Sequence, residues 1–182
     1  DAGAAYLYDS SGALVRTFLN PATAGVAGLD LFGSAVVLLD NFVVIGAPAA
    51  EANGGNGAVY IFNRTSGALV TTSTGPNPGS LDGFGGTLTT LGSLLVIGAP
   101  AKDTIVGDAI GEVYLYAFDG VTATLVRTIA NPTPEVGDRF GQALAVSGAR
   151  LLIGAPFDDR AGPDAGAAYL IDANTATVLK EF

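Results

Sequence analysis

The stretch DLFGSAVVLLDNFVVIGAP, residues 30–48, contains the pattern that decides the fold of this chain. Two apolar runs follow one another, separated by the polar pair at 40–41, and the second run ends in Gly-Ala-Pro at 46–48. Short apolar runs bounded by turn-forming residues predict β-strands joined by a tight hairpin. A proline cannot donate a hydrogen bond to a sheet, so Pro48 marks the end of the second strand.

The same landmarks recur along the chain in the same order. Phe-Gly followed by Gly-Ala-Pro occurs three times, and the Phe-Gly pairs are 52 and 56 residues apart. The motif residues are Phe32, Gly33, Gly46, Ala47, Pro48, Phe84, Gly85, Gly98, Ala99, Pro100, Phe140, Gly141, Gly154, Ala155 and Pro156. A glycine followed by a tyrosine-bearing strand recurs four times, at Gly3, Gly57, Gly111 and Gly166. The spacing is slightly above the period of roughly 40 to 50 residues that is typical of four-stranded propeller blades.

The middle repeat predicts four strands, at about 86–91, 94–98, 111–116 and 124–129. The second run has no polar alternation, which indicates a strand covered on both faces by neighbouring blades. The fourth strands carry Arg16, Arg127 and Lys180 in matching positions, which is typical of an exposed outer edge that is protected against pairing with other chains.

We therefore expect an all-β protein, a β-propeller of four-stranded antiparallel blades with about 3.5 blades in this chain. The expected units are the outer half of a blade at 1–21 and three blades at 22–78, 79–133 and 134–182. Three and a half blades do not close a seven-bladed ring. The missing strands would come from further blades of the same protein or from another copy.

Phe-Gly, then Gly-Ala-Pro, then Gly-x-x-Tyr resembles the FG-GAP repeat of integrin α-subunit propellers and their bacterial relatives. The resemblance covers nearly the whole chain. It implies a seven-bladed propeller, usually outside the cell, that binds protein or carbohydrate ligands through loops on one face. It also implies a location that is extracellular or on the cell surface.

The calcium loop of this family is missing. Calcium-binding members carry an Asp-rich loop, D-x-[DN]-x-[DN]-G-x-x-D, between the first two strands of a blade. This chain has only short turns there, at 40–41, 92–93 and 147–148. These turns offer fewer oxygens than the about six to eight that Ca²⁺ takes. We expect no cofactor and no metal at them.

The loops that follow Gly-Ala-Pro differ most between repeats, at 49–56, 101–110 and 157–165. Variable loops on a repeated scaffold are where ligand binding usually lies. The densest acidic cluster, formed by Asp158, Asp159 and Asp164, is either a weak calcium candidate or an ordinary solvated loop, and we favour the second.

Two further repeated residue types each have a structural and a functional interpretation. The aspartates two positions before Phe-Gly are turn caps or a ring of ligand carboxylates, and the tyrosines of the third strands are core residues or sugar-stacking platforms. We favour the structural interpretation for both. The aspartates are Asp30, Asp82 and Asp138, and the tyrosines are Tyr6, Tyr60, Tyr114 and Tyr169. Separately, Asn63 begins a glycosylation acceptor pattern on the hairpin between third and fourth strands.

Composition excludes several function classes. The chain has no histidine and no cysteine, which removes imidazole bases, thiolate nucleophiles and disulfides. Its formal net charge of −9 argues against nucleic acid as a partner. The apolar stretch 31–50 has Asp-Asn at its midpoint, which argues against membrane insertion.

The sequence predicts a protein that is not an enzyme. The first expectation is an extracellular adhesion or recognition module that binds a protein or glycan ligand through propeller loops. The alternative is a self-assembling surface or filament protein joined through unclosed blade edges. A lectin is less favoured because the chain has no tryptophan, the best stacking residue.

Overall fold

Short apolar runs bounded by glycine, proline, aspartate and asparagine form strands along the chain. The structure is a computed structural model and describes residues 3–21, 30–50, 55–76, 81–104 and 106–182. The expected unit boundaries near 22 and 78, and part of the loop at 49–56, lie outside these ranges. No helix in the described ranges is long and apolar enough to cross a membrane.

The strands in the described residues are β1 (Ala4–Tyr8), β2 (Leu14–Leu19), β3 (Ala35–Leu39), β4 (Phe42–Ala47), β5 (Ala58–Asn63), β6 (Leu69–Thr74), β7 (Thr87–Leu91), β8 (Leu94–Ala99), β9 (Glu112–Phe118), β10 (Ala123–Ala130), β11 (Ala143–Ser147), β12 (Arg150–Ala155), β13 (Ala167–Asp172) and β14 (Thr177–Glu181). The strands of the middle repeat lie within two residues of their predicted positions.

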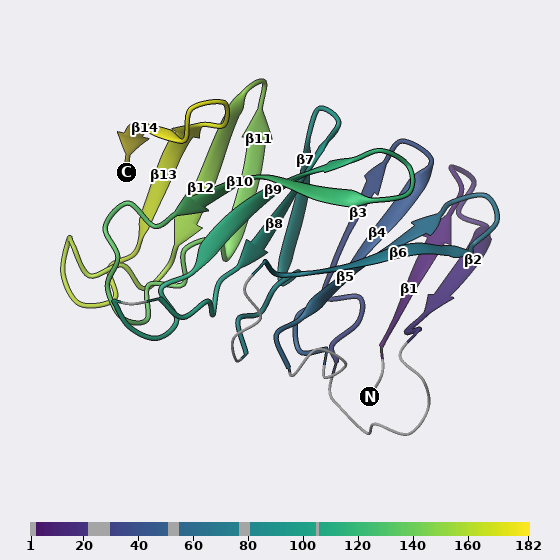
Figure 1. Ribbon diagram of the computed structural model, residues 1–182, viewed down its shortest axis with the longest axis horizontal. Coiled ribbons are helices and arrows are strands. Elements are labelled where there is room, and N and C mark those ends of the chain that lie inside the picture. The colour runs from purple at the N-terminus through teal and green to yellow at the C-terminus, as the bar shows by residue number, and fades with distance from the viewer. Residues whose placement is uncertain (1–2, 22–29, 51–54, 77–80, 105) are drawn as a thin grey trace.

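The strands form one two-stranded sheet and three four-stranded antiparallel sheets. We call β1–β2 the half-blade, β3–β6 blade 1, β7–β10 blade 2 and β11–β14 blade 3. Consecutive strands pair within each blade, so the chain enters at the first strand and leaves at the fourth (Figure 1). This is the meander of a propeller blade, and the fold class is confirmed.

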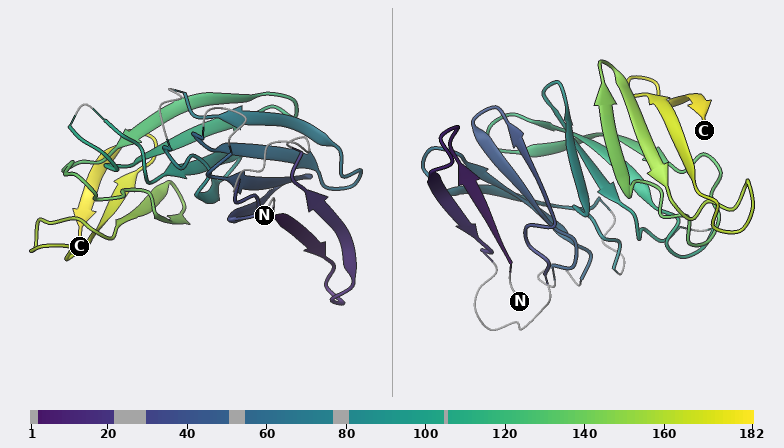
Figure 2. Two further views of the ribbon diagram at one scale, coloured as in Figure 1. Left: turned by 90° about the horizontal axis from the view of Figure 1, so that it is seen from below. Right: turned by 180° about the vertical axis from the view of Figure 1, so that it is seen from behind.

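The sheets stand face to face in a curved row that does not close (Figure 2). Apolar side chains fill the space between neighbours. Ala5 and Phe18 of the half-blade pack on Tyr60 of blade 1, and Val59 of blade 1 joins the core that contains Tyr114 of blade 2. Each blade therefore gains a core only from its neighbour, as expected for repeat architectures.

A second strand is covered on both faces only in a blade that has a neighbouring sheet on each side. Val43 to Ala47 in β4 and Leu95 to Ala99 in β8 are all buried. The sequence predicts the same for Leu151 to Ile153, but Leu152 is 38% exposed. The prediction is wrong there because no further blade among the described residues covers the outer face of blade 3.

The fourth strands form the outer edge. Arg16, Arg127 and Lys180 each pair with the residue that follows the repeated tyrosine position, so their matching register is confirmed. A register shift of the β-bulge kind interrupts all four pairings between third and fourth strands. Bulges and charged residues are devices that protect sheet edges against pairing with other chains.

Three of the four repeated tyrosines are core residues. Tyr60, Tyr114 and Tyr169 are buried against the preceding sheet. Tyr6 is 59% exposed, which corrects the expectation that it is a core residue. Within the described residues, no sheet precedes the half-blade for this side chain to pack against.

Candidate functional site

Two rims border the row of blades. The loop rim contains the described parts of the loops from second to third strands and of the crossings from one blade to the next, along the lower edge of Figure 1. The hairpin rim, opposite, contains the tight turns between first and second strands and between third and fourth strands. Asn63, the glycosylation candidate, ends β5 on the hairpin rim, and its Oδ1 accepts the backbone N–H groups of Thr65 and Ser66.

The motif glycines lie at close backbone contacts between neighbouring blades, near the loop rim. We call each of these contacts a joint. A Cβ on Gly46 of blade 1 would stand 2.0 Å from the carbonyl oxygen of Gly85 in blade 2. A Cβ on Gly57 would stand 2.3 Å from the carbonyl oxygen of Phe84. Only glycine permits this approach, so the Phe-Gly backbone of one blade fits between two glycines of the preceding blade.

The second joint repeats the first. Gly98 and Gly111 of blade 2 lie against the carbonyl oxygens of Gly141 and Phe140, with Cβ positions 2.5 and 2.1 Å away. The phenyl ring of Phe140 turns instead to its own blade, where it packs on Tyr169 with ring centroids 5.8 Å apart. The motif is therefore a structural joint.

Blade 3 carries the same glycine pair without an equivalent contact. A Cβ on Gly154 would meet only Ala143 of its own blade, 3.2 Å away, and one on Gly166 would meet Pro156. A pocket of about 480 Å³ lies there, lined by both glycines, Ala155 and Phe182. The outer face of blade 3 thus presents an unoccupied joint.

The repeated aspartates are buried beside the joints. The main-chain carbonyls of Asp30 and Asp82 accept the N–H of the residue after Gly-Ala-Pro, at 3.2 and 3.1 Å. The side chain of Asp30 accepts the amide of Asn20, whereas that of Asp82 pairs with Lys102 at 3.0 Å. Position and main-chain role are shared. Asp138 accepts the equivalent asparagine, Asn131, so Lys102 beside Asp82 is the departure among the three repeats.

Asp138 is the most enclosed of the three. It is 0% exposed, and its Oδ2 accepts Asn131 Nδ2 at 2.6 Å and the N–H of Glu135 at 2.7 Å. Its Oδ1 has no hydrogen-bond partner among the described residues, and the same holds for Oδ1 of Asp82. Burial raises the pKa of the Asp138 carboxyl above its ordinary value of 3.8. The bond to Glu135 fits the turn-cap interpretation.

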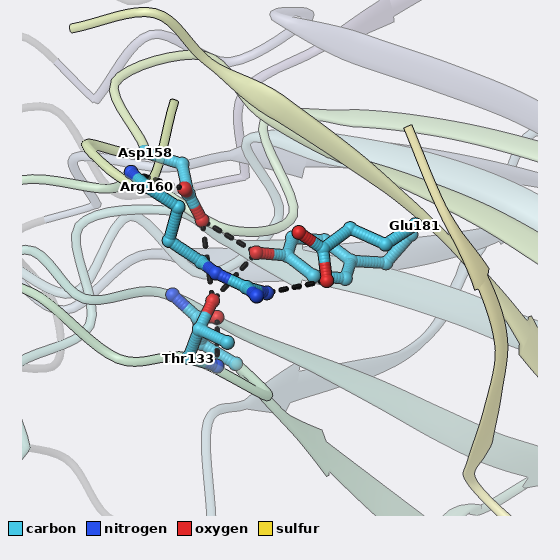
Figure 3. A network of polar contacts seen from close by, with 6 residues as sticks. Thr133, Asp158, Arg160 and Glu181 are labelled. Carbon is cyan, nitrogen blue, oxygen red and sulfur yellow. Dashed lines mark hydrogen bonds and ion pairs between the residues drawn. The ribbon is translucent and has the colours of Figure 1, made fainter. Parts of the chain in front are cut away.

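A polar network joins the crossing before blade 3 to the loop after its Gly-Ala-Pro (Figure 3). The hydroxyls of Tyr169 and Thr133 both donate to Oδ2 of Asp158, and Oδ1 of Asp158 accepts the N–H of Arg160 at 3.1 Å. The Arg160 guanidinium forms an ion pair with Glu181. Burial, together with the Asp158 carboxylate, raises the pKa of Tyr169 to about 12.

The acidic cluster does not converge on a common point. The Asp158 carboxylate accepts hydrogen bonds from Tyr169 and Thr133, while Oδ1 of Asp159 accepts the N–H of Asp164 at 2.6 Å. Within the residues that the structure describes, no group of three acidic side chains is placed to hold a metal ion.

Neighbouring loops join into one surface on blades 2 and 3. The N–H groups of Gly137 and Arg139 donate to the carbonyls of Asp108 and Ala109, at 3.1 and 3.0 Å. We call the exposed side chains of this surface the loop patch: Val106, Val136, Arg139 and Phe157. The Arg139 guanidinium lies 5.2 Å from the Phe157 ring centre, a cation–π contact.

Sequence reasoning found the variable loops but not these contacts. The side chains of Thr133 and Tyr169 are far apart in sequence and meet only through the joint between blades. Val136 is a lone apolar residue in the polar segment 133–139, and this was the available signal for the loop patch.

Comparisons with known proteins agree with an architecture of repeated blades. A sequence model of the FG-GAP repeat matches residues 23–62 and 128–171. These two segments are similar to FG-GAP repeats. No curated protein sequence matches the chain.

Solved structures share the fold at low sequence identity. A chain in the crystal structure of the computationally designed Ika8 protein matches with a TM-score of 0.50 at 15% identity, covering 92% of this chain and 42% of that one. A chain in the crystal structure of the mitotic checkpoint complex matches with a TM-score of 0.62 at 14% identity, covering 97% and 43%. This chain thus spans about two fifths of the length of these two chains.

Proposed function

We propose that the chain is a non-catalytic recognition module, extracellular or on the cell surface, that binds a protein or glycan ligand through the loop rim. The observation that carries this proposal is the loop patch. A shared scaffold holds an exposed apolar and cationic surface built from two different repeats.

The energetics of the patch suit a binding surface. Val136 is 65% exposed and Val106 53% exposed, so both leave apolar area that a ligand can cover. Phe157 is 38% exposed under the Arg139 guanidinium. Aromatic and arginine side chains contribute most of the binding energy in many interfaces. The hydrogen bonds from 137 and 139 to 108 and 109 hold the backbone in place, which limits the entropy cost of binding.

The ligand of the loop patch could belong to either of two classes, glycan or protein. A glycan would stack on aromatic rings, and the patch has one such ring, Phe157, in a chain without tryptophan. A protein would use the whole patch, including both valines. We therefore favour a protein ligand, and binding on a glycan array but not to any extracellular protein would reverse that preference.

The test compares one binding surface with a matched control. The chain is screened against extracellular proteins and glycans, and each hit is measured again with the double variant Val136→Asp, Phe157→Ala. The control is Val121→Asp, which is 68% exposed on the hairpin rim. We expect the control to bind each ligand found in the screen and the double variant to lose that binding. Hits that survive in both would contradict the loop patch, and turnover dependent on Asp158 or Asp159 would contradict a non-catalytic role.

The second candidate is a self-assembling surface or filament protein. It is favoured by the uncovered ends of the row, where Gly154 and Gly166 form an unoccupied joint and Phe182 is 62% exposed. An end that contacts a different surface of the next copy produces rings or filaments. Mass in solution separates the candidates: a monomer at high concentration removes assembly, and concentration-dependent polymers support it.

A further inference from the structure

Blade 2 differs from the other two complete blades at two positions beside its buried aspartate. The first position lies two residues after the proline of Gly-Ala-Pro, and the second is the first residue of the third strand. In blade 2 these positions hold Lys102 and Glu112, so an amine and a second carboxylate occur together in this blade alone. The corresponding residues are Ala50 and Ala58 in blade 1 and Asp158 and Ala167 in blade 3.

Lys102 lies against the buried carboxylate of Asp82. Its Nζ is 3.0 Å from Oδ2 of Asp82, and the two side chains are 12% and 5% exposed. The carboxyl carbon of Asp82 is at most one C–O bond farther from the nitrogen, which is near the separation of about 3–3.5 Å from which positioned groups react. Oδ1 of Asp82 has no hydrogen-bond partner among the described residues. This oxygen therefore lacks the donors that normally satisfy a buried carboxylate.

Main-chain hydrogen bonds fix the two residues relative to each other. The N–H of Ala101 donates to the carbonyl oxygen of Asp82, and the N–H of Lys102 donates to that of Ala99, both at 3.1 Å. The carbonyl oxygen of Lys102 accepts the N–H of Gly111 at 3.1 Å. The amine and the carboxyl group are therefore held together by the fold, which greatly raises their effective concentration.

Glu112 supplies the second carboxylate of this cluster. It pairs with Ala99 in the sheet, and its Oε2 accepts the Tyr114 hydroxyl at 2.6 Å. Burial raises the pKa of Tyr114 above its ordinary value of 10.0, and the negative charges of Glu112 and Asp82 add to this effect. The Tyr114 hydroxyl thus lies close to both carboxylates.

Blade 3 shows how this tyrosine position lies relative to the position of Lys102. There the hydroxyl of Tyr169 donates to Asp158, which is the counterpart of Lys102. The loop after Gly-Ala-Pro therefore brings this position to the tyrosine hydroxyl. The same correspondence in blade 2 places Tyr114, and with it Glu112, beside the amine of Lys102.

We propose that Lys102 and Asp82 become joined by an intramolecular isopeptide bond, with Glu112 as the proton carrier. The lysine ammonium passes a proton to the Asp82 carboxylate, which gives an amine and a carboxylic acid; burial disfavours the charged forms. The Nζ lone pair attacks Cγ of Asp82, and the C–N bond forms as the carbonyl π electrons move to oxygen. Glu112 accepts a proton from the nitrogen and returns it to the hydroxyl oxygen, the C–O bond breaks, and water leaves. One ammonium and one carboxylate thus become one amide and one water, without an oxidant or a reductant.

The bond fastens the loop rim of blade 2. Asp82 lies in the crossing before β7 and Lys102 in the loop after β8, so the bond closes a covalent ring around these two strands. Such a ring reduces the conformational freedom of the unfolded chain, as a disulfide does, and the chain has no cysteine. The loop that it fastens also contains Asp108 and Ala109, which support the loop patch.

Intact-mass spectrometry of the full, folded chain tests the proposal. After incubation at neutral pH, we expect a mass that is lower than that of the sequence by one water molecule. Trypsin should then fail to cut after Lys102, because an amide replaces its amine. A fragment of residues 65–127, lighter by one water, should therefore replace the fragments 65–102 and 103–127.

Three variants and one control assign the bond to its residues. Lys102→Arg keeps the positive charge without the amine and should retain the full mass. Asp82→Asn should lose one molecule of ammonia in place of water, because its leaving group is an amide nitrogen. Glu112→Gln should slow bond formation by roughly tenfold or more. The control is Lys180→Arg, which changes an exposed lysine and should still lose water. Circular dichroism checks that each variant is folded.

A different dehydration at the same aspartate is separated by chemistry. Asp82 precedes Gly83, and cyclisation of this pair to a succinimide loses the same mass. Hydroxylamine cleaves a chain at a succinimide and leaves an isopeptide bond intact. A folded chain that keeps its full mass would overturn the proposal, as would a loss of water that persists in Lys102→Arg or a chain that hydroxylamine cleaves at Asp82. None of these results depends on ligand binding at the loop patch.

Discussion

The carbonyl oxygen of Gly85 occupies the space that a side chain on Gly46 would need, 2.0 Å from the position of its Cβ. These residues belong to different blades and to different halves of the repeated motif. Their contact explains why Phe-Gly and Gly-Ala-Pro recur together, since each supplies one side of the next joint.

Gly46→Ala should therefore destabilise the protein through a steric clash at the joint. Neither Gly46 nor Gly154 has a left-handed backbone, so alanine tests space alone at both positions. We expect Gly46→Ala to lower the free energy of unfolding by about 1–3 kcal/mol or more, measured by urea denaturation. Gly154→Ala, with its nearest neighbour at 3.2 Å, should stay within about 1 kcal/mol of the unmodified chain. Equal losses would contradict the joint.

Leu31→Gly should stabilise the protein. The residue between the repeated aspartate and phenylalanine has a left-handed backbone in each repeat, with φ of 56° at Leu31 and 71° at Gly83. A branched side chain is disfavoured there, and Leu31 is 49% exposed. We expect a gain of about 0.5–1 kcal/mol in unfolding free energy. Leu31→Ala is the control: an equal gain would show that loss of the side chain, and not the backbone, is responsible.

Tyr169→Phe should weaken the polar network of blade 3. It removes the hydroxyl that donates to the carboxylate of Asp158, which is 1% exposed. A buried carboxylate that loses a donor costs about 1–3 kcal/mol, which thermal or urea unfolding would detect. Tyr6→Phe alters an exposed ring and should change stability by less than about 0.5 kcal/mol. A loss no larger than that of the Tyr6 variant would argue against the network.

Asp138 should make stability depend on pH in a direction opposite to most carboxylates. Its pKa is raised in the folded state by burial, so the folded protein holds this proton more tightly than the unfolded chain does. The stabilisation is complete below the ordinary pKa of 3.8 and is lost as pH rises through the folded value. The stability advantage of the unmodified chain over Asp138→Asn should therefore fall as pH rises above 3.8.

Asp119 provides the comparison of opposite sign. Backbone N–H groups of Thr122 and Val121 lower its pKa, so its contribution is present above 3.8 and is lost as pH falls through the lower folded value. The advantage over Asp119→Asn should rise with pH. Parallel trends for the two variants, followed by urea titrations at several pH values, would contradict the burial of Asp138.

The strands could be predicted because turn residues delimit them locally. Gly92 and Ser93 separate β7 from β8, and Pro100 follows the end of β8, so the bounds follow from single residues. Burial could not be predicted at the ends of the row. Tyr6 has the same local sequence as its buried counterparts, and only the absence of a preceding blade exposes it.

The candidate site was less accessible from the sequence. The glycine of Gly-Ala-Pro indicates that another backbone segment approaches closely. The sequence does not show that this segment is the carbonyl of a glycine in the next blade, because that depends on how whole sheets stack. The loop patch brings Val136 beside Gly107 through irregular backbone, for which no periodicity exists. Such contacts require coordinates.

Nuclear Overhauser spectroscopy of the glycine protons tests the stacking of blades through these joints most directly. Contacts within blade 1, such as that between Val44 and Ile61, provide the internal reference because they report only the sheet itself. We predict strong cross-peaks between the protons of Gly46 and Gly85 and between those of Gly98 and Gly141. A spectrum that keeps the cross-peaks within blades but lacks those between the glycines would contradict the stacking of blades through these joints.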